Sequence, residues 1–209
     1  MIVEAGWGAR VMPIEMFTAL VVFTSAMAFT PGPNNIMVTA SGVNFGFRRT
    51  LPHILGITFG FVVLLIGCAA GLGAVFAAYP PLQIVLKAAG AIYLLWLAWK
   101  IATTTPSTGE DARVAQPITF MQAALFQWVN PKAVVAALSA IAIYVRPAHW
   151  MSDFGVLLVV FAIATVLAVA TWTAFGVALR RVLTNPKHAR IFNVAMALLL
   201  VASIVPMVV

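Results

Sequence analysis

The sequence predicts an all-α integral membrane protein with six transmembrane helices, arranged as two inverted halves of three helices each. The first observation is composition: 63% of the 209 residues are hydrophobic and 8% are charged, whereas soluble domains carry about 25% charged residues. The second is that the apolar residues gather in six runs, each long enough to cross a bilayer as a helix. The third is that a polar connection divides these runs three and three, so the halves must enter the membrane from opposite sides.

Helix is the expected state of every run, because lipid offers no partner to unpaired backbone groups and the runs lack the alternation of a membrane barrel. The expected spans lie at 14–43, 51–78, 82–101, 118–144, 154–179 and 191–209. The whole chain, 1–209, then forms one transmembrane domain, with a first half at 14–101, a polar loop at 102–117 and a second half at 118–209. Residues 1–13 form an N-terminal extension, and Met12 is a candidate natural start that would make residues 1–11 a misassigned start.

The distribution of charge predicts the orientation. The net charge is +7, but the cations lie in short breaks between apolar runs, which is typical of the positive-inside pattern rather than of nucleic-acid binding. The first, third and fifth connections with their flanks hold eight Lys and Arg residues, and the outer segments hold two, Arg10 and Arg146. Loops 44–50, 102–117 and 180–190 are therefore expected in the cytoplasm and both termini on the outer, periplasmic side.

Two expected spans carry helix breaks at corresponding places in the two halves. The first span is interrupted at 30–35 (TPGPNN) and the fourth at 130–132 (NPK), both near or just past the middle of the membrane. A proline removes a backbone donor and obstructs the carbonyl four residues earlier, so two prolines around a glycine should unwind a turn. Matching Gly/Pro breaks in two halves indicate the binding site of a transporter.

Such breaks offer binding groups for both charges of a zwitterion. The half-helix that starts near Asn34 offers free N–H groups to an anion, and the half-helix that ends near Phe29 offers free carbonyls to a cation. A structural kink is the alternative, since proline is common in membrane helices; the two readings weigh equally for the second break, while adjacent carboxamides at membrane depth favour a site at the first. The candidate substrate-binding residues are Thr30, Pro31, Gly32, Pro33, Asn34, Asn35, Asn130, Pro131 and Lys132.

Few ionisable residues lie within or beside the spans, and these are the candidates for coupling to a gradient. Lys132 lies too deep to reach the interface easily, whereas Lys87, in the third span, is interpreted as snorkelling to the outer interface. His53 lies near the cytoplasmic face, where it titrates near neutral pH or makes an interfacial hydrogen bond. No carboxylate lies inside a span, and Glu15, at the outer end of the first span, is the fourth candidate.

The sequence favours neither an enzyme nor a metal or cofactor site. Three scattered histidines and the single Cys68 show no ligand spacing, and no Ser/His/Asp or His/Glu set occurs within the spans. We therefore expect no catalytic residue, no metal and no cofactor. Two alternatives to a carrier stay open: a passive channel, which should line a continuous polar path, and a non-transport assembly subunit, which would leave the matched breaks unexplained.

Three stretches of the chain resemble signatures of the LysE/RhtB family of bacterial amino-acid exporters. They are residues 29–35 (FTPGPNN) followed by 46–49 (GFRR), residues 86–94 (LKAAGAIYL) with Trp99 and Lys100, and residues 126–132 (FQWVNPK). The last stretch includes Gln127, which joins the candidate substrate-binding set. The resemblance covers the chain from Met12 onward, and the three stretches occur in the expected order and spacing.

The resemblance implies six helices in the bacterial cytoplasmic (inner) membrane and export of small neutral amino acids or their derivatives, driven by the proton or membrane gradient. The Asn34-Asn35 pair and the run 99–103 (WKIAT) look most like the branch that exports cysteine and O-acetylserine, beside exporters of the homoserine and threonine type. The implied partners are an amino-acid substrate and the lipid bilayer, without nucleic acid. Because the family is often drawn as dimers, a homodimer is also expected.

Overall fold

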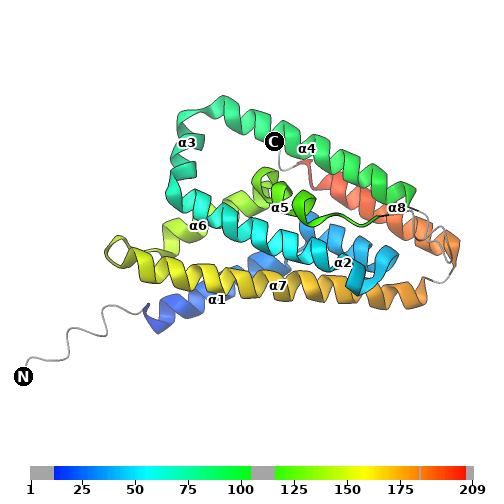
Figure 1. Ribbon diagram of the computed structural model, residues 1–209, viewed down its shortest axis with the longest axis horizontal. Helices are drawn as coiled ribbons and strands as arrows, with labels where there is room; N and C mark the ends of the chain where they lie inside the picture. The colour runs from blue at the N-terminus through cyan, green and yellow to red at the C-terminus, as the bar shows by residue number, and fades with distance from the viewer. Residues whose placement is uncertain (1–11, 105–115, 184, 206–209) are drawn as a thin grey trace, which may run out of the picture.

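The computed structural model describes residues 12–104, 116–183 and 185–205, and all regular elements in these ranges are helical (Figure 1). They are α1 (Ile14–Phe29), α2 (Pro33–Gly67), a π-helical turn (Cys68–Leu72), α3 (Gly73–Ala78), α4 (Pro80–Thr103), α5 (Phe120–Val129), α6 (Pro131–Tyr144), a 3-10 turn (Pro147–His149), α7 (Trp150–Val182) and α8 (Pro186–Ala202). Residues 1–11 of the expected N-terminal extension and residues 105–115 of the expected loop lie outside the described ranges.

The described helices have the length and hydropathy of a membrane protein. Three stretches, Pro33–Gly71, Pro81–Thr103 and Pro147–Val182, are long and apolar enough to cross a bilayer. The α5–α6 pair, bent by 65° at its break, makes a fourth if it counts as one span, and α1 is a shorter apolar helix. The all-helical membrane class is therefore confirmed, while the arrangement of six spans in inverted halves stays a prediction.

The prediction of a loop at 44–50 is wrong, because the chain reverses its direction at a single residue inside α2. Gly46 has φ 78° and ψ 172°, and the residues on both sides of it are helical. The hydroxyls of Ser41 and Thr50 lie 3.0 Å apart, whereas nine residues of straight helix would separate them by roughly 13 Å. Glycine reaches this left-handed conformation without a Cβ penalty, so no longer connection is needed.

The expected loop at 180–190 and the last span also need correction. Helix α7 continues to Val182 and α8 begins at Pro186, so only residues 183–185 join them. The physical reason is local: the Asn185 side chain accepts a hydrogen bond from the Lys187 N–H at 2.9 Å, and proline is favoured at the first helical position. Helix α8 therefore starts before the expected residue 191 and ends at Ala202.

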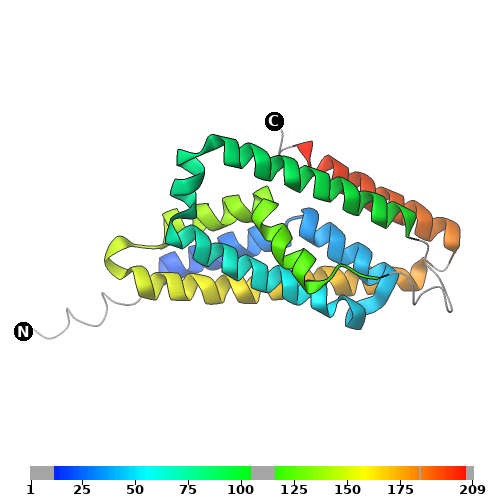
Figure 2. The same ribbon diagram turned by 45° about the horizontal axis from the view of Figure 1, so that its top comes forward.

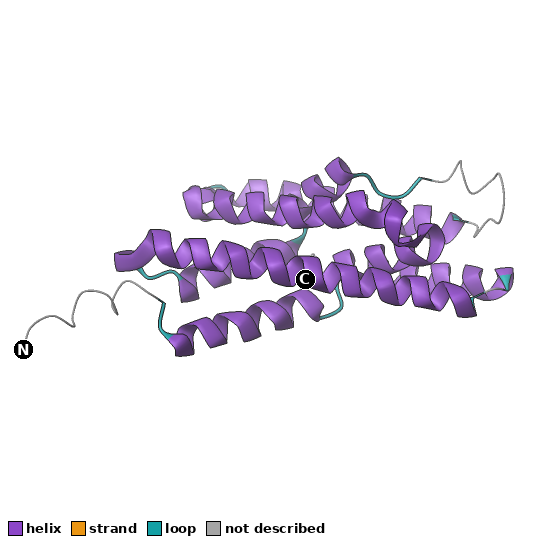
Figure 3. Cartoon of the chain, turned by 60° about the horizontal axis from the view of Figure 1, so that its bottom comes forward, coloured by secondary structure: helices purple, strands orange, loops and turns teal. Residues whose placement is uncertain are grey.

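Most of the long helices run roughly along one axis of the molecule (Figures 2 and 3), and glycines bring α2 into close contact with α5 and α7. A Cβ on Gly56 would lie 2.9 Å from the Ala123 Cβ, and one on Gly60 would lie 2.5 Å from the Ala124 Cα. On the other side, a Cβ on Gly176 of α7 would overlap the Thr39 carbonyl. Small residues allow such close approach of membrane helices, and here they bring α2 against both α5 and α7.

Candidate functional site

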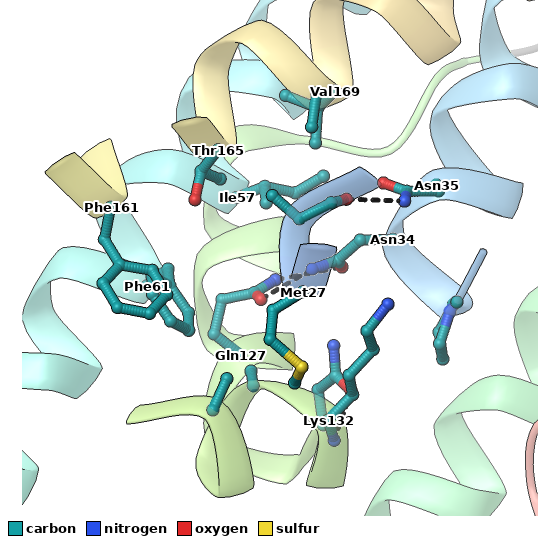
Figure 4. A pocket seen from close by; sticks show the side chains of 17 residues that line it. Met27, Asn34, Asn35, Ile57, Phe61, Gln127, Lys132, Phe161, Thr165 and Val169 are labelled. Atoms are coloured by element: carbon teal, nitrogen blue, oxygen red, sulfur yellow. Dashed lines mark hydrogen bonds between the residues drawn. The ribbon is translucent and has the colours of Figure 1, made fainter. Parts of the chain in front are cut away.

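A small pocket, with about 70 Å³ of unfilled space, lies where the two helix breaks meet. Figure 4 shows it between α1, α2, the α5–α6 break and α7. Its lining joins the two apolar clusters of the core, since Ile57 belongs to one cluster and Phe61 to the other. The pocket is lined by Met27, Ala28, Gly32, Pro33, Asn34, Asn35, Ile57, Phe61, Gln127, Asn130, Lys132, Ala133, Ala136, Phe161, Thr165, Ala168 and Val169.

At the first break, side chains bind the last carbonyls of α1. The Asn35 amide donates to the carbonyls of Ala28 at 2.9 Å and Thr30 at 3.0 Å, and the Trp172 indole donates to the carbonyl of Phe29 at 3.3 Å. The carbonyls of Ala28, Phe29 and Thr30 are therefore not free, contrary to the expectation near Phe29. Asn35 is buried and ties the end of α1 to the start of α2, so the break has a fixed geometry.

The start of α2 keeps the free donors that the sequence predicts. Pro33 has no N–H, and the Ile36 N–H binds the Gly32 carbonyl at 3.0 Å. Within the described residues, the backbone N–H groups of Asn34 and Asn35 have no hydrogen-bond partner. Since helix N-termini carry a partial positive charge, these two groups are available to an anion beside the pocket.

At the second break, Asn130 caps α6 and positions Lys132. The Asn130 side-chain oxygen accepts a hydrogen bond from the Lys132 N–H at 3.2 Å, and the Asn130 backbone carbonyl accepts one from the Val134 N–H at 3.1 Å. The Lys132 ammonium crosses the pocket and donates to the Thr30 carbonyl at 2.6 Å. A Cβ on Gly32 would lie 3.0 Å from the Lys132 Cδ, so glycine leaves room for this side chain.

A reciprocal pair of carboxamides joins the two breaks. Asn34 donates to Gln127 at 2.8 Å, and Gln127 donates back at 3.2 Å (dashed in Figure 4). The Gln127 amide also donates to the Ala123 carbonyl at 2.9 Å. Because Gln127 is fully buried, these bonds satisfy polar groups that would otherwise be costly at this depth.

The structure brings together most of the predicted substrate-binding residues. Those that line the pocket are Gly32, Pro33, Asn34, Asn35, Gln127, Asn130 and Lys132. Thr30 contributes its carbonyl, which accepts a hydrogen bond from Lys132, whereas Pro31 is exposed and does not line the pocket. Pro131 instead lines a second, mostly apolar cavity beside α4, together with Lys87.

The other coupling candidates lie away from the pocket lining. Glu15 is exposed in the first turn of α1, and Lys87 is exposed on α4. His53 is fully buried, and neither ring nitrogen has a hydrogen-bond partner among the described residues, so the expected interfacial hydrogen bond is not formed. At the outer end of α7, Asp153 pairs with Arg146 at 2.7 Å, and this hydrogen bond raises the pKa of the Arg146 guanidinium.

Sequence reasoning missed the apolar wall of the pocket. Helix α7 contributes Phe161, Thr165 and Val169, and α2 contributes Ile57 and Phe61. The α7 residues lie in a long apolar run without Pro or Gly nearby, and Ile57 and Phe61 each follow a glycine that indicates helix packing. No local signal therefore separates a pocket wall from lipid-facing or core positions. The four-residue spacing of Phe161, Thr165 and Val169 indicates a shared face of α7, but not what that face contacts.

Similarity to known proteins identifies the family. The family model described as LysE type translocator matches residues 25–204. The chain belongs to the LysE family. The cysteine/O-acetylserine efflux protein of Escherichia coli (strain K12) is 34% identical to this LysE family member over 195 residues, which cover 91% of the chain and 96% of the relative. The protein of the same name from Shigella flexneri is 34% identical over 191 residues, covering 89% and 94%. No solved structure matches.

Proposed function

We propose that this protein is a secondary transporter that exports small neutral amino acids or derivatives of the cysteine and O-acetylserine type across the cytoplasmic membrane. The observation that carries the proposal is the pocket at the joined helix breaks, which combines free N–H groups, a lysine and a bound carbonyl in a mostly apolar enclosure. The names of its relatives in Escherichia coli and Shigella support the substrate class.

A zwitterionic amino acid matches the two polar ends of this site. Its carboxylate fits the free N–H groups of Asn34 and Asn35 at the start of α2. Its ammonium fits the Thr30 carbonyl, which accepts a hydrogen bond from the Lys132 ammonium at 2.6 Å. Substrate binding therefore displaces Lys132 from Thr30 and frees its charge for the substrate carboxylate, so the site exchanges one bound cation for another.

The proposed topology has six spans in two inverted halves, with the termini in the periplasm and the polar connections in the cytoplasm. The reversal at Gly46 supports it, because α1 with the first part of α2 and the remainder of α2 then run as two antiparallel segments. The α5–α6 pair gives the corresponding broken segment of the second half. Alternating access would rock one half against the other around the pocket.

The close contacts around the pocket support such alternation. A Cβ on Gly42 would lie 3.3 Å from the Val177 N, at the cytoplasmic side of the pocket by this topology. On its outer side, Phe161 contacts the rings of Phe23 and Phe61, with centroids 6.5 Å and 5.2 Å apart. Helix packing therefore lies on both sides of the pocket, and in this proposal each packing contact opens in one half of the cycle.

We propose that the proton gradient drives export through Lys132 and His53. Lys132 competes with the substrate ammonium for Thr30, and His53 is a buried base without a partner among the described residues. A His53→Leu variant should keep substrate exchange at equal pH on both sides but lose accumulation driven by a pH gradient. Unchanged gradient-driven accumulation would exclude His53 from coupling.

Counterflow in proteoliposomes tests the proposed function. The purified protein is reconstituted and offered labelled cysteine, O-acetylserine, homoserine, threonine, leucine, lysine and arginine. Saturable exchange of one or a few small neutral members is the expected result. Flux that rises linearly with concentration would indicate a channel, and no exchange by a folded, inserted protein would contradict amino-acid transport.

A further inference from the structure

One hydroxyl in the pocket wall has no role in the fold. Thr165 lies on α7 and lines the pocket, and its hydroxyl has no hydrogen-bond partner among the described residues. Other threonines within the described helices donate to the carbonyl four residues earlier: Thr18, Thr39, Thr50, Thr58, Thr103, Thr171 and Thr173. Thr165 could make the same bond to Phe161 by a change of rotamer, yet it does not.

Thr165 differs from Thr24, whose hydroxyl also lacks a partner among the described residues. Thr24 is fully buried in the packing of α1 and is absent from the pocket lining. The Thr165 side chain is only partly buried, and the space beside it is the pocket. A hydroxyl that faces a cavity without a protein partner is free to bind what enters the cavity.

The position of Thr165 assigns it to one part of the substrate. Figure 4 shows Thr165 between Phe161 and Ile57, on the far side of the pocket from Lys132. The charged ends of an amino acid fit the break side, where Lys132 and the α2 N–H groups lie. Its side chain then extends toward Thr165, among apolar neighbours that offer no competing hydrogen bond.

We propose that Thr165 is a specificity residue, which hydrogen-bonds the oxygen or sulfur on the side chain of a small polar amino acid. This rests on the proposed function and deepens it, because the site then prefers serine, O-acetylserine and cysteine over apolar isosteres of the same size. Thr165 donates to an ester or hydroxyl oxygen and accepts from a hydroxyl or thiol. A thiol bonds more weakly than a hydroxyl, so Thr165 contributes more to serine and O-acetylserine than to cysteine.

Serine and 2-aminobutyrate form the test pair, because they differ by a hydroxyl in place of a methyl group. Half-saturating concentrations for exchange are measured in proteoliposomes for wild type, Thr165→Val, Thr165→Ser and the control Thr171→Val. Valine keeps the shape of threonine and removes the hydroxyl. Thr171 lies on the same helix, and its hydroxyl bonds the Leu167 carbonyl at 2.7 Å and is exposed away from the pocket.

In the wild type, serine should half-saturate at a lower concentration than 2-aminobutyrate. Thr165→Val should raise the value for serine about three- to tenfold, the worth of one hydrogen bond, and leave that for 2-aminobutyrate unchanged. Thr165→Ser should restore the preference, and Thr171→Val should keep it. Equal losses for both substrates, or a full preference in Thr165→Val, would overturn the specificity role while leaving export intact. A wild type that exchanges neither substrate nor O-acetylserine would instead overturn the proposed function.

Discussion

The two helix breaks that meet at the pocket differ in size and in what they supply. The first leaves three residues, 30–32, between α1 and α2, and its binding groups are backbone carbonyls and N–H groups held by Asn35. The second is the single residue Asn130 with a bend of 65°, and it supplies a side-chain cation, Lys132. Corresponding positions in two halves therefore need not share chemistry: one break provides fixed dipoles and the other a movable charge.

The largest effect is expected from removing the first break. Replacing Pro31, Gly32 and Pro33 together with alanine should join α1 to α2 as a continuous helix, because alanine restores the missing donors and favours helix. The N–H groups of Asn34 and Asn35 would then be used within the helix. Counterflow should fall to background while the protein still inserts and elutes as a single species. Unchanged flux would show that the break is a structural kink.

Removing the charge at the second break should have the next largest effect. Lys132→Gln keeps most of the side-chain length but removes the charge that the proposed function assigns to the substrate carboxylate, and a hydrogen bond to a charged group is worth roughly 1.5–3 kcal/mol. The rate of exchange at low substrate should fall about tenfold or more. Lys87→Gln is the matched control, because Lys87 is exposed at the second cavity and should leave exchange unaltered. Equal behaviour of the two variants would assign Lys132 a structural role.

The amide pair between the breaks should matter more for stability than for charge recognition. Gln127→Leu would leave the Asn34 carboxamide without its partner at membrane depth, a loss of about 1–3 kcal/mol in the free energy of unfolding. The thermal midpoint of the purified variant should fall, and added substrate should restore part of it because a bound ligand stabilises the folded state. A midpoint equal to that of the wild type would show that the pair is not coupled to the fold.

The smallest effect is expected from replacing Asn130, and it separates the role of Asn130 as a helix cap from its role in orienting Lys132. Asn130→Ala should cost about 0.5–2 kcal/mol of stability, as loss of a helix N-cap generally does. Asn185→Ala removes a cap of the same kind from α8, with a 2.9 Å bond to the Lys187 N–H, and should cost a similar amount. Only Asn130→Ala should also reduce exchange, because Asn130 orients Lys132. Equal exchange in both variants would deny Asn130 that positioning role.

Much of the fold and the polar half of the site could be predicted because Pro, Gly and Asn act locally. The breaks at 30–35 and 130–132 follow from backbone rules that hold in any surroundings. The same rules explain the errors in the connections. A single glycine, Gly46, was enough to reverse the chain, and Asn185-Pro186 began α8 earlier than the apolar pattern indicates.

The apolar half of the site could not be predicted, because tertiary packing decides it. Thr165 and Phe161 lie in an unbroken apolar helix, and only the contacts of α7 with α1 and α2 turn their face toward the pocket. Tertiary packing also explains why the carbonyls at the end of α1 were wrongly predicted to be free. Two of their partners, Trp172 and Lys132, lie more than 100 residues away in the sequence, whereas the third, Asn35, is close in the chain.

The central claim, that substrate occupies the pocket between the two breaks, is tested most directly by protection from a thiol reagent. In a Cys68→Ala background, Ala136→Cys places a thiol in the pocket lining, and Val135→Cys places one on the neighbouring residue at the second cavity. A transported amino acid should slow labelling of Ala136→Cys, with half protection at the concentration that half-saturates exchange, and leave labelling of Val135→Cys unchanged. Protection of Val135→Cys alone, or of neither variant, would contradict the claim.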